Sequence, residues 1–535
     1  MRIATVLALT LAVGTAAPAA FADGTGPSTN GLWRMDGYGT VVALTHGTYQ
    51  EYQTTAVSCL KGDTARRTGP GTYTVNGDVL TVRLGEDANH ASVATASSAG
   101  HKQLHRIGSL PPTCTKRLPT DPVTSFDVFW QSFEENYPFF AAKGVDWRAV
   151  RAEYRPRVHA DTTRAELFDI FSAMVRPLHD AHVVVQDGGH TFATGRPGTE
   201  PPTPELDARA KKFIEQHDLT GATYHRDFAN GRITYADLRG DSRLGYLRIS
   251  GFGGYLPQEN ASYASQLAEL DRALNTILTS KRVGRLHGLI IDLRINGGGS
   301  DAMGLHIASR LTDTPYIAYA KRARNHPRNP AHHTHPEPIP VLPAHSPRHT
   351  GPIAILTGGS TVSAGETFTQ ALMNRPGETI RIGQPTQGVF SDTLTRRLPN
   401  GMAAWLPNEE FLTHSGHTFD GTGIPPQVRV PVFTEEEFAE GRDSGFAGAV
   451  GVLGIVGAEG LGPGCPSRRA ARALLYLGRH AEGVRKAGVL LAVEQARESA
   501  ARVVQDVQVV LACRGGGFTR LAPAPHLSPD QNSRS

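Results

Sequence analysis

The chain has 535 residues and a mass of 57.4 kDa, of which 39% are hydrophobic and 19% are charged. That is enough apolar chain for two or three packed domains, and it excludes an intrinsically disordered protein. The 54 lysines and arginines against 50 aspartates and glutamates leave a net charge of +4. This charge is small for the length, so the composition argues against a nucleic-acid partner.

The first 22 residues have the layout of a secretory signal peptide. Met1-Arg2 precedes an apolar run over 3–14, and small residues follow up to Ala22. The apolar run, about a dozen residues, is shorter than the roughly 20 that a membrane-spanning helix needs. We therefore expect cleavage near Ala22, a secreted or cell-envelope location, and no stable membrane span in the mature chain.

Residues 23–118 alternate apolar and polar side chains over short runs, which is typical of antiparallel strands. Asn76-Gly77 lies between two such runs and is a strong hairpin signal, because both positions of that turn need a positive φ. The four cysteines fall into an early and a late pair, which is compatible with two disulfides in an exported chain. The pairs are Cys59 with Cys114 and Cys465 with Cys513. We expect a small β domain stapled by the early pair.

Residues 119–185 follow as a helical segment. Phe126, Phe129, Trp130 and Phe133 recur at helical spacing, which is typical of a buried helix face rather than of a ligand box. Residues 186–240 are rich in Gly, Pro, Thr and charges with weak periodicity, and we interpret them as a connector.

Residues 241–457 have an α/β pattern in which a buried strand, a Gly-rich turn and a helix occur twice. The first unit spans 286–293, 296–300 and 301–311, and the second spans 352–357, 358–365 and 366–374. Such units predict a largely parallel sheet whose turns gather at the carboxyl edge, where sites form in open α/β folds.

Two further regions carry no assigned function. The stretch 326–349 is rich in Pro and His, including His332, His333 and His335, but no carboxylate or cysteine completes a ligand set. We interpret it as an exposed loop and expect neither a metal nor a cofactor. Residues 458–535 form an Arg- and Ala-rich tail.

The second Gly-rich turn places Ser363 between a buried strand and a helix N-terminus. There the helix dipole and free backbone N–H groups stabilise developing negative charge, and the turn at Asn296–Gly299 can add further N–H groups. Each turn alone is equally compatible with a phosphate cradle or a mere tight turn. Neither has the Gly-Lys-Ser/Thr ending of a P-loop, and Thr361 breaks the Gly-x-Ser-x-Gly signature at Ser363.

A serine nucleophile needs a base, and His182 is one candidate. It lies where the helical segment ends and a Val-rich strand begins. The alternative is a purely structural role for His182, as a helix-end charge or a core histidine.

Five motifs in order resemble the serine peptidase family of tail-specific (C-terminal processing) proteases, the tricorn protease core and the interphotoreceptor retinoid-binding protein modules. The matching motifs are 126–137 with 145–147, 178–182, 290–294 with 296–299, 361–366 and 419–426. The resemblance covers about residues 120 to 455. It implies a crotonase-like α/β core with a helical subdomain, next to the small N-terminal antiparallel β domain.

The resemblance also implies roles for residues. Ser363 matches the nucleophile, while Val389 stands where the processing proteases carry a lysine base. The chain is therefore similar to the branch with a histidine base, and His182 occupies that position. Asp420 matches the acidic member of the relay, whereas Ala181 replaces the serine that precedes the histidine in tricorn.

These assignments predict an acyl-enzyme mechanism acting on a peptide or protein substrate. His182 would take the Ser363 proton, backbone N–H groups of Ala364 and of Gly298 or its neighbours would hold the oxyanion, and Asp420 or Asp180 would orient the imidazole. The alternatives are a non-catalytic ligand- or peptide-binding protein on the same core, and an esterase or amidase. The sequence leaves the oligomeric state open.

Overall fold

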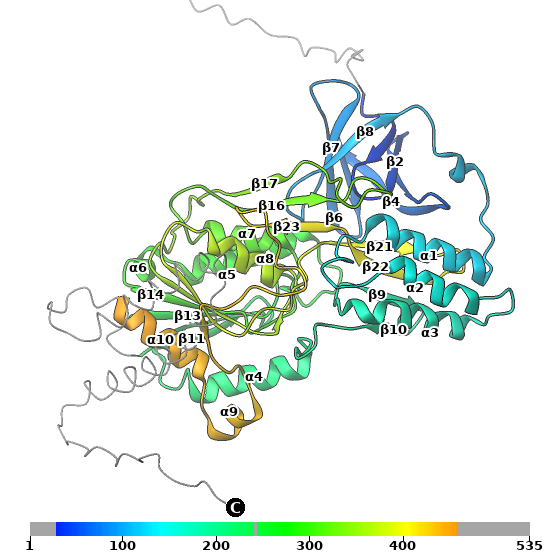
Figure 1. Cartoon of the computed structure of the whole chain (residues 1–535). Helices are drawn as coiled ribbons and strands as arrows, with labels where there is room; N and C mark the ends of the chain where they lie inside the picture. Colours follow the sequence, from blue (N-terminus) through cyan, green and yellow to red (C-terminus); the bar gives the residue numbers. More distant parts are fainter. Residues whose placement is uncertain (1–27, 240–242, 457–535) are drawn as a thin grey trace, which may run out of the picture.

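The computed structural model describes residues 28–239 and 243–456. The expected signal peptide over 1–22, Cys465 and Cys513, and the tail over 458–535 lie outside the described residues. Figure 1 shows three packed parts, which are an N-terminal barrel in blue, a helical subdomain in cyan and an α/β core. No helix within the described ranges is long and apolar enough to cross a lipid bilayer.

Residues 31–107 form a closed, eight-stranded antiparallel barrel in which β1 pairs with both β2 and β8. Its strands are β1 (Gly31–Met35), β2 (Thr40–Thr45), β3 (Thr48–Thr54), β4 (Cys59–Gly69), β5 (Thr72–Val75), β6 (Asp78–Leu84), β7 (His90–Thr95) and β8 (Lys102–Ile107). Asn76 and Gly77 have φ values of 50° and 80° and join β5 to β6, as predicted. The predicted Cys59–Cys114 disulfide ties the barrel to the short helix η1 (Pro112–Thr115). The antiparallel β domain is thus confirmed as a barrel.

The helical subdomain packs an aromatic helix face against a four-stranded sheet. Its helices are α1 (Pro122–Asn136), α2 (Trp147–Tyr154), η2 (Arg155–Arg157), α3 (Arg164–Val175) and η3 (Arg176–Leu178). Phe129 of α1 stacks on Phe171 of α3 with ring centroids 4.0 Å apart, so the aromatic stripe is core, as predicted. The sheet has the order β10-β9-β22-β21. Its strands are β9 (Val184–Asp187), β10 (His190–Ala193), β21 (Thr393–Arg397) and β22 (Ala403–Pro407).

The core is a seven-stranded sheet with the order β11-β12-β13-β14-β18-β20-β24, parallel from β13 onward. Its strands are β11 (Tyr224–Phe228), β12 (Ile233–Asp237), β13 (Leu244–Ile249), β14 (Gly288–Asp292), β18 (Ile353–Thr357), β20 (Thr379–Gly383) and β24 (Val428–Arg429). The α/β core with a parallel sheet agrees with the sequence pattern, with bounds shifted by one or two residues.

Helices cover both faces of this sheet. One face packs on α5 (Tyr263–Ile277), α7 (Asp301–Ser309) and α8 (Ala364–Met373), and the other on α4 (Pro204–His217) and α10 (Ser444–Val456). Two short helices, α6 (Ser280–Val283) and α9 (Glu435–Glu440), complete the core. Figure 1 shows α4 and α10 on the side of the core away from the barrel.

The segment 186–240 differs from the expected connector. It supplies β10 and the second half of β9 to the sheet of the helical subdomain, then α4, β11 and β12 to the core. Only β9 has a distant partner, β22, whereas β10 pairs with β9, β11 with β12, and β12 with the adjacent β13. The weak periodicity of the segment does not reveal these short strands.

A three-stranded sheet joins the core to the barrel (Figure 1). It consists of β16 (Tyr316–Ala323), β17 (Glu337–Val341) and β23 (Glu409–Leu412). The buried Lys321 of β16 donates to the Ala99 carbonyl of the barrel at 3.0 Å. The expectation of an exposed loop over 326–349 is thus wrong in part. Residues 337–341 form strand β17, and His349 is buried.

Candidate active site

Ser363 lies at the junction of the two-residue strand β19 (Ser360–Thr361) and helix α8. Its backbone has φ 55° and ψ −121°, a conformation that L-residues adopt only under strain. The Ser363 N–H donates to the Val389 carbonyl at 3.1 Å. The next N–H, that of Ala364, has no acceptor in the part of the chain that the structure describes. The sharp turn thus presents a half-buried hydroxyl beside a free helix N-terminal amide.

The turn Asn296–Gly299 lies directly against Ser363. It follows β15 (Ile295–Asn296), which pairs in parallel with β19. A methyl group on Gly298 would stand 2.6 Å from the Ser363 Cβ and 3.1 Å from its Oγ, so only glycine allows this approach. The Gly298 N–H already donates to Asn296 Oδ1 at 2.9 Å. The Gly297 N–H donates to the Ser250 carbonyl, whereas the N–H of Gly299 has no acceptor among the described residues. Of the two neighbours of Gly298, Gly299 is thus the one with a free donor.

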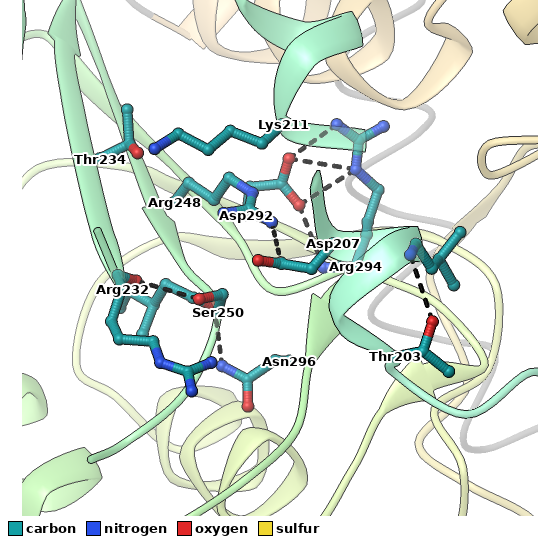
Figure 2. A network of polar contacts seen from close by, with 12 residues as sticks. Thr203, Asp207, Lys211, Arg232, Thr234, Arg248, Ser250, Asp292, Arg294 and Asn296 are labelled. Atoms are coloured by element: carbon teal, nitrogen blue, oxygen red, sulfur yellow. Dashed lines mark hydrogen bonds and ion pairs between the residues drawn. The ribbon is translucent and has the colours of Figure 1, made fainter. Parts of the chain in front are cut away.

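A buried ion network supports the strand that leads into this turn (Figure 2). Arg294 is 1% exposed and donates to both carboxylate oxygens of Asp292 and, at 2.7 Å, to Asp443. Burial raises the pKa of the Asp292 carboxyl, but the guanidinium of Arg294 outweighs it, so the pKa is lowered overall. In the same network Arg248 binds Asp207 of α4. The charges fix the end of β14, which is followed by β15 and the glycine turn.

His182 lies between η3 and β9. Its backbone N–H donates to Asp180 Oδ1 at 2.9 Å, and Asp180 Oδ2 accepts the Tyr137 hydroxyl at 2.8 Å. Burial lowers the pKa of His182, while the carboxylates of Asp180 and Asp392 and the carbonyl of Ser391 raise it. Because burial dominates, the imidazole is neutral near pH 7. Its Nδ1 is buried and has no hydrogen-bond partner among the described residues.

One loop, 386–392, contacts both Ser363 and His182. The Val389 carbonyl accepts a hydrogen bond from the Ser363 N–H, and the Ser391 carbonyl raises the pKa of the His182 imidazole. The carboxyl of Glu366 in α8 holds this loop by accepting hydrogen bonds from the N–H groups of Gly388 at 2.6 Å and Val389 at 2.9 Å. Across the described ranges, no hydrogen bond joins the side chains of Ser363 and His182. The loop therefore brings the two residues to one region, with no hydrogen bond between their side chains in the described ranges.

The carboxyl of Asp420 is engaged with this loop rather than with the imidazole. Asp420 Oδ1 accepts the Phe390 N–H at 3.3 Å, and Oδ2 accepts the Thr418 hydroxyl at 2.5 Å. Burial and the charge of Asp180 raise the pKa of Asp420 well above its usual range. Of the two acids expected to orient His182, Asp180 contacts the residue through its backbone N–H, and no hydrogen bond to the imidazole is found for either carboxyl among the described residues.

The segment expected as a connector covers the two glycine turns. The side chain of Pro202 would lie 3.7 Å from a methyl group on Gly297, and that of Thr199 would lie within 3.0 Å of one on Gly359. Arg196 donates to the carbonyls of Thr386 at 2.6 Å and Gln387 at 3.0 Å. Sequence reasoning missed this cover and also the role of Glu366, although a serine followed three residues later by a glutamate is a capping signal.

The part of the chain that the structure describes contains one cluster of side chains that could bind a metal ion. This cluster, Glu215, His225 and Asp227, brings ligand atoms within 4.8 Å of one another, with His225 and Asp227 exposed. Asp227 already binds Lys211 and Thr234. The cluster consists of residues of α4 and β11 and includes none of the residues around Ser363, so it carries no chemistry for that site.

Comparison with known proteins gives two family matches. Residues 243–430 match the model described as Peptidase family S41, and residues 120–176 match the Tricorn protease C1 domain. Ser363 lies within the first range, and His182 follows the second by six residues, 182 against 176. No protein of curated function matches the sequence.

Several solved structures are similar. A presumed peptidase from Parabacteroides merdae is 24% identical, with a TM-score of 0.52 over 62% of this chain and 96% of that one. Mature CPAF in complex with lactacystin is 11% identical, with a TM-score of 0.46 over 67% and 99% of the two chains. The photosystem II D1 C-terminal processing protease is 16% identical, with a TM-score of 0.37 over 59% and 94%. The first of these similarities shows a shared fold.

Proposed function

Since this chain contains a peptidase family S41 domain and is a serine peptidase, we propose that it cleaves peptide bonds with Ser363 as nucleophile and His182 as general base. The position of Ser363 carries the proposal. Its hydroxyl stands at the N-terminus of α8, beside the free N–H of Ala364 and against the glycine turn. These are the surroundings in which an attacking oxygen and a developing oxyanion are both stabilised.

His182 fits the role of base because burial keeps its imidazole neutral near pH 7. Its side chain and Ser363 both adjoin the loop 386–392. The resemblance to the processing proteases offers no lysine base here, since Val389 stands at the matching position of the loop and cannot accept a proton. In free enzymes the hydrogen bond between nucleophile and base is often long and tightens when substrate binds, so its absence between Ser363 and His182 in the described residues does not oppose these roles.

In the proposed reaction, Ser363 Oγ attacks the peptide carbonyl carbon while His182 takes the hydroxyl proton. The N–H of Ala364, together with an N–H of the glycine turn, holds the oxyanion, and each such donor is typically worth about 10²–10³ in rate. We assign the second donor to Gly299 rather than Gly298, because the Gly298 amide is engaged by Asn296. His182 then protonates the leaving amine, and water hydrolyses the acyl-enzyme.

We also propose that the chain is exported and acts outside the cytoplasm on peptides or proteins, on a core of the crotonase type. The layout of residues 1–22 supports export. The Cys59–Cys114 disulfide adds support, because such bonds persist in oxidising compartments.

The test uses purified residues 23–535 with two readouts, casein cleavage followed by mass spectrometry and labelling by a fluorophosphonate probe, which reacts with activated serines. Ser363→Ala and His182→Ala should each lose both activities while remaining folded. Ser444→Ala is the matched control, since Ser444 lies in an Asp-Ser-Gly sequence far along the chain and should keep wild-type rates.

Four outcomes would contradict the proposal. Equal activity of Ser363→Ala would remove the nucleophile, and a wild-type rate for His182→Ala would move the base elsewhere. A folded wild-type protein that neither cleaves nor is labelled would favour the binding protein. Cleavage of ester substrates alone would favour the esterase.

A further inference from the structure

The barrel reaches the proposed catalytic centre through the loop between β7 and β8. Ser97 accepts the Ser300 hydroxyl at 2.5 Å, directly after the glycine turn. The hydroxyl of the next residue, Ser98, donates to Asp392 Oδ2 at 2.5 Å, and Ala99 accepts from Lys321. Three consecutive barrel residues thus contact the segments that flank the site.

Asp392 stands at the centre of these contacts. It directly follows Ser391. The Asp392 charge and the Ser391 carbonyl both raise the pKa of the His182 imidazole. Lys321 Nζ lies 3.6 Å from Asp392 Oδ2 and 3.2 Å from Glu409 Oε2. The Asp392 side chain keeps 37% of its surface exposed, so this carboxylate is not sealed within the interface.

We infer that Asp392 is a positioning residue that stabilises the protonated form of His182 during catalysis, and that Ser98 of the barrel holds Asp392 in place. The barrel is then part of the catalytic machinery and not an appended module. This inference rests on the proposed function of Ser363 and His182.

The other acids near the site are already engaged. Both oxygens of Asp180 accept hydrogen bonds, one from the His182 backbone and one from Tyr137. Asp420 is held by Phe390 and Thr418. Asp392 Oδ1 has no donor among the residues that the structure describes, and His182 Nδ1 likewise lacks a partner there. A free carboxylate oxygen and a free ring nitrogen are the two groups that an orienting hydrogen bond requires.

The electrostatics point the same way. The groups that act on His182 are Asp180 from its own turn and Asp392 with the Ser391 carbonyl from the facing loop. Burial raises the pKa of Asp392, but Lys321, Lys102 and the Ser98 hydroxyl outweigh it and lower the pKa overall. Asp392 is therefore a carboxylate at the pH at which His182 is neutral, ready to stabilise the imidazolium that forms when Ser363 attacks.

The experiment measures the rate of Ser363 labelling by the fluorophosphonate probe between about pH 5 and pH 9. Labelling forms the Oγ–P bond, expels fluoride and sends the hydroxyl proton to His182, so it reports on the base without a known peptide substrate. Asp392→Asn should slow labelling by about tenfold or more and move the acid limb of the pH profile to lower pH, since the pKa of His182 falls when the nearby charge is removed.

Ser98→Ala leaves every charge in place. It should slow labelling and lower the acid limb of the pH profile as Asp392→Asn does, but by smaller amounts. His101→Ala is the matched control, because it removes a contact between the same loop and Glu337 but touches neither Asp392 nor His182. It should label like wild type. Thermal unfolding measures the stability of each variant. If Asp392→Asn is unstable because Lys321 has lost a partner, the labelling rate and pH profile of Ser98→Ala decide whether Asp392 has the positioning role.

The outcomes separate this inference from the function on which it rests. If Ser363→Ala and His182→Ala abolish labelling but the folded Asp392→Asn matches wild type in rate and pH profile, the positioning role is wrong and the proposed function stands. If Asp392→Asn and His101→Ala slow labelling equally without a change of pH profile, the barrel acts only as a structural support. If wild type itself is not labelled, the proposed function fails and this inference with it.

Discussion

Replacing Ser363 by glycine should separate the stability of the nucleophile turn from its chemistry. Ser363 has φ 55° and ψ −121°, outside the regions that side chains with a Cβ normally occupy. Glycine adopts a positive φ without that steric cost. The informative comparison is Ser363→Gly against Ser363→Ala, because both lack the hydroxyl and only glycine lacks the Cβ.

The expected difference follows from two opposing effects. A strained backbone of this kind costs on the order of 1–3 kcal/mol in the folded state. Glycine loses about 0.5–1 kcal/mol through its greater freedom in the unfolded chain. The first effect is the larger, so we expect Ser363→Gly to be more stable than Ser363→Ala by about 1 kcal/mol, with both variants inactive.

Urea denaturation of the two variants measures this difference in the free energy of unfolding. Ala268, an exposed residue within α5, provides the control. Ala268→Gly should destabilise the protein by about 1 kcal/mol, the usual cost in a helix interior. If Ser363→Gly were less stable than Ser363→Ala by a similar amount, the turn would hold no strain and the reasoning would be refuted.

Three other substitutions test the site and its supports. The pKa of the buried Glu366 is raised by burial to about 7 from an ordinary 4.5, so the folded protein keeps a proton that the unfolded chain releases. Stability should therefore fall by on the order of 3 kcal/mol as pH rises through this window, and Glu366→Gln should flatten the fall; equal slopes in urea titrations would contradict this. Joint replacement of Cys59 and Cys114 by serine opens a loop with a sequence separation of 55 residues. It should cost about 2–4 kcal/mol, and an unchanged melting temperature would show that the bond contributes nothing. Arg294→Met leaves the two aspartates that it binds buried without a cation. It should cost about 3–5 kcal/mol in chemical denaturation, and a loss under 1 kcal/mol would contradict this prediction.

Local patterns were sufficient for the elements that carry the proposed chemistry. The Asn76-Gly77 turn was predictable because its dihedral angles suit few residue types. The strand, glycine turn and helix around Ser363 were predictable because apolar periodicity and glycine positions are local properties of the chain. Ordered family motifs then pointed to Ser363 and His182 together, which neither turn does alone.

The tertiary structure alone decided the surroundings of these residues. Strand β9, which leads into the segment 186–240, pairs with β22, far away in sequence, so the composition of the segment could not reveal this pairing. Asp420 accepts the Phe390 N–H, 30 positions away, because register and burial determine which group each donor meets. No sequence spacing relates Ser98 to Asp392, which lie 294 positions apart. Periodicity reports which face of an element is buried, whereas the partner of a buried polar group depends on how distant elements pack, and only the folded chain determines that.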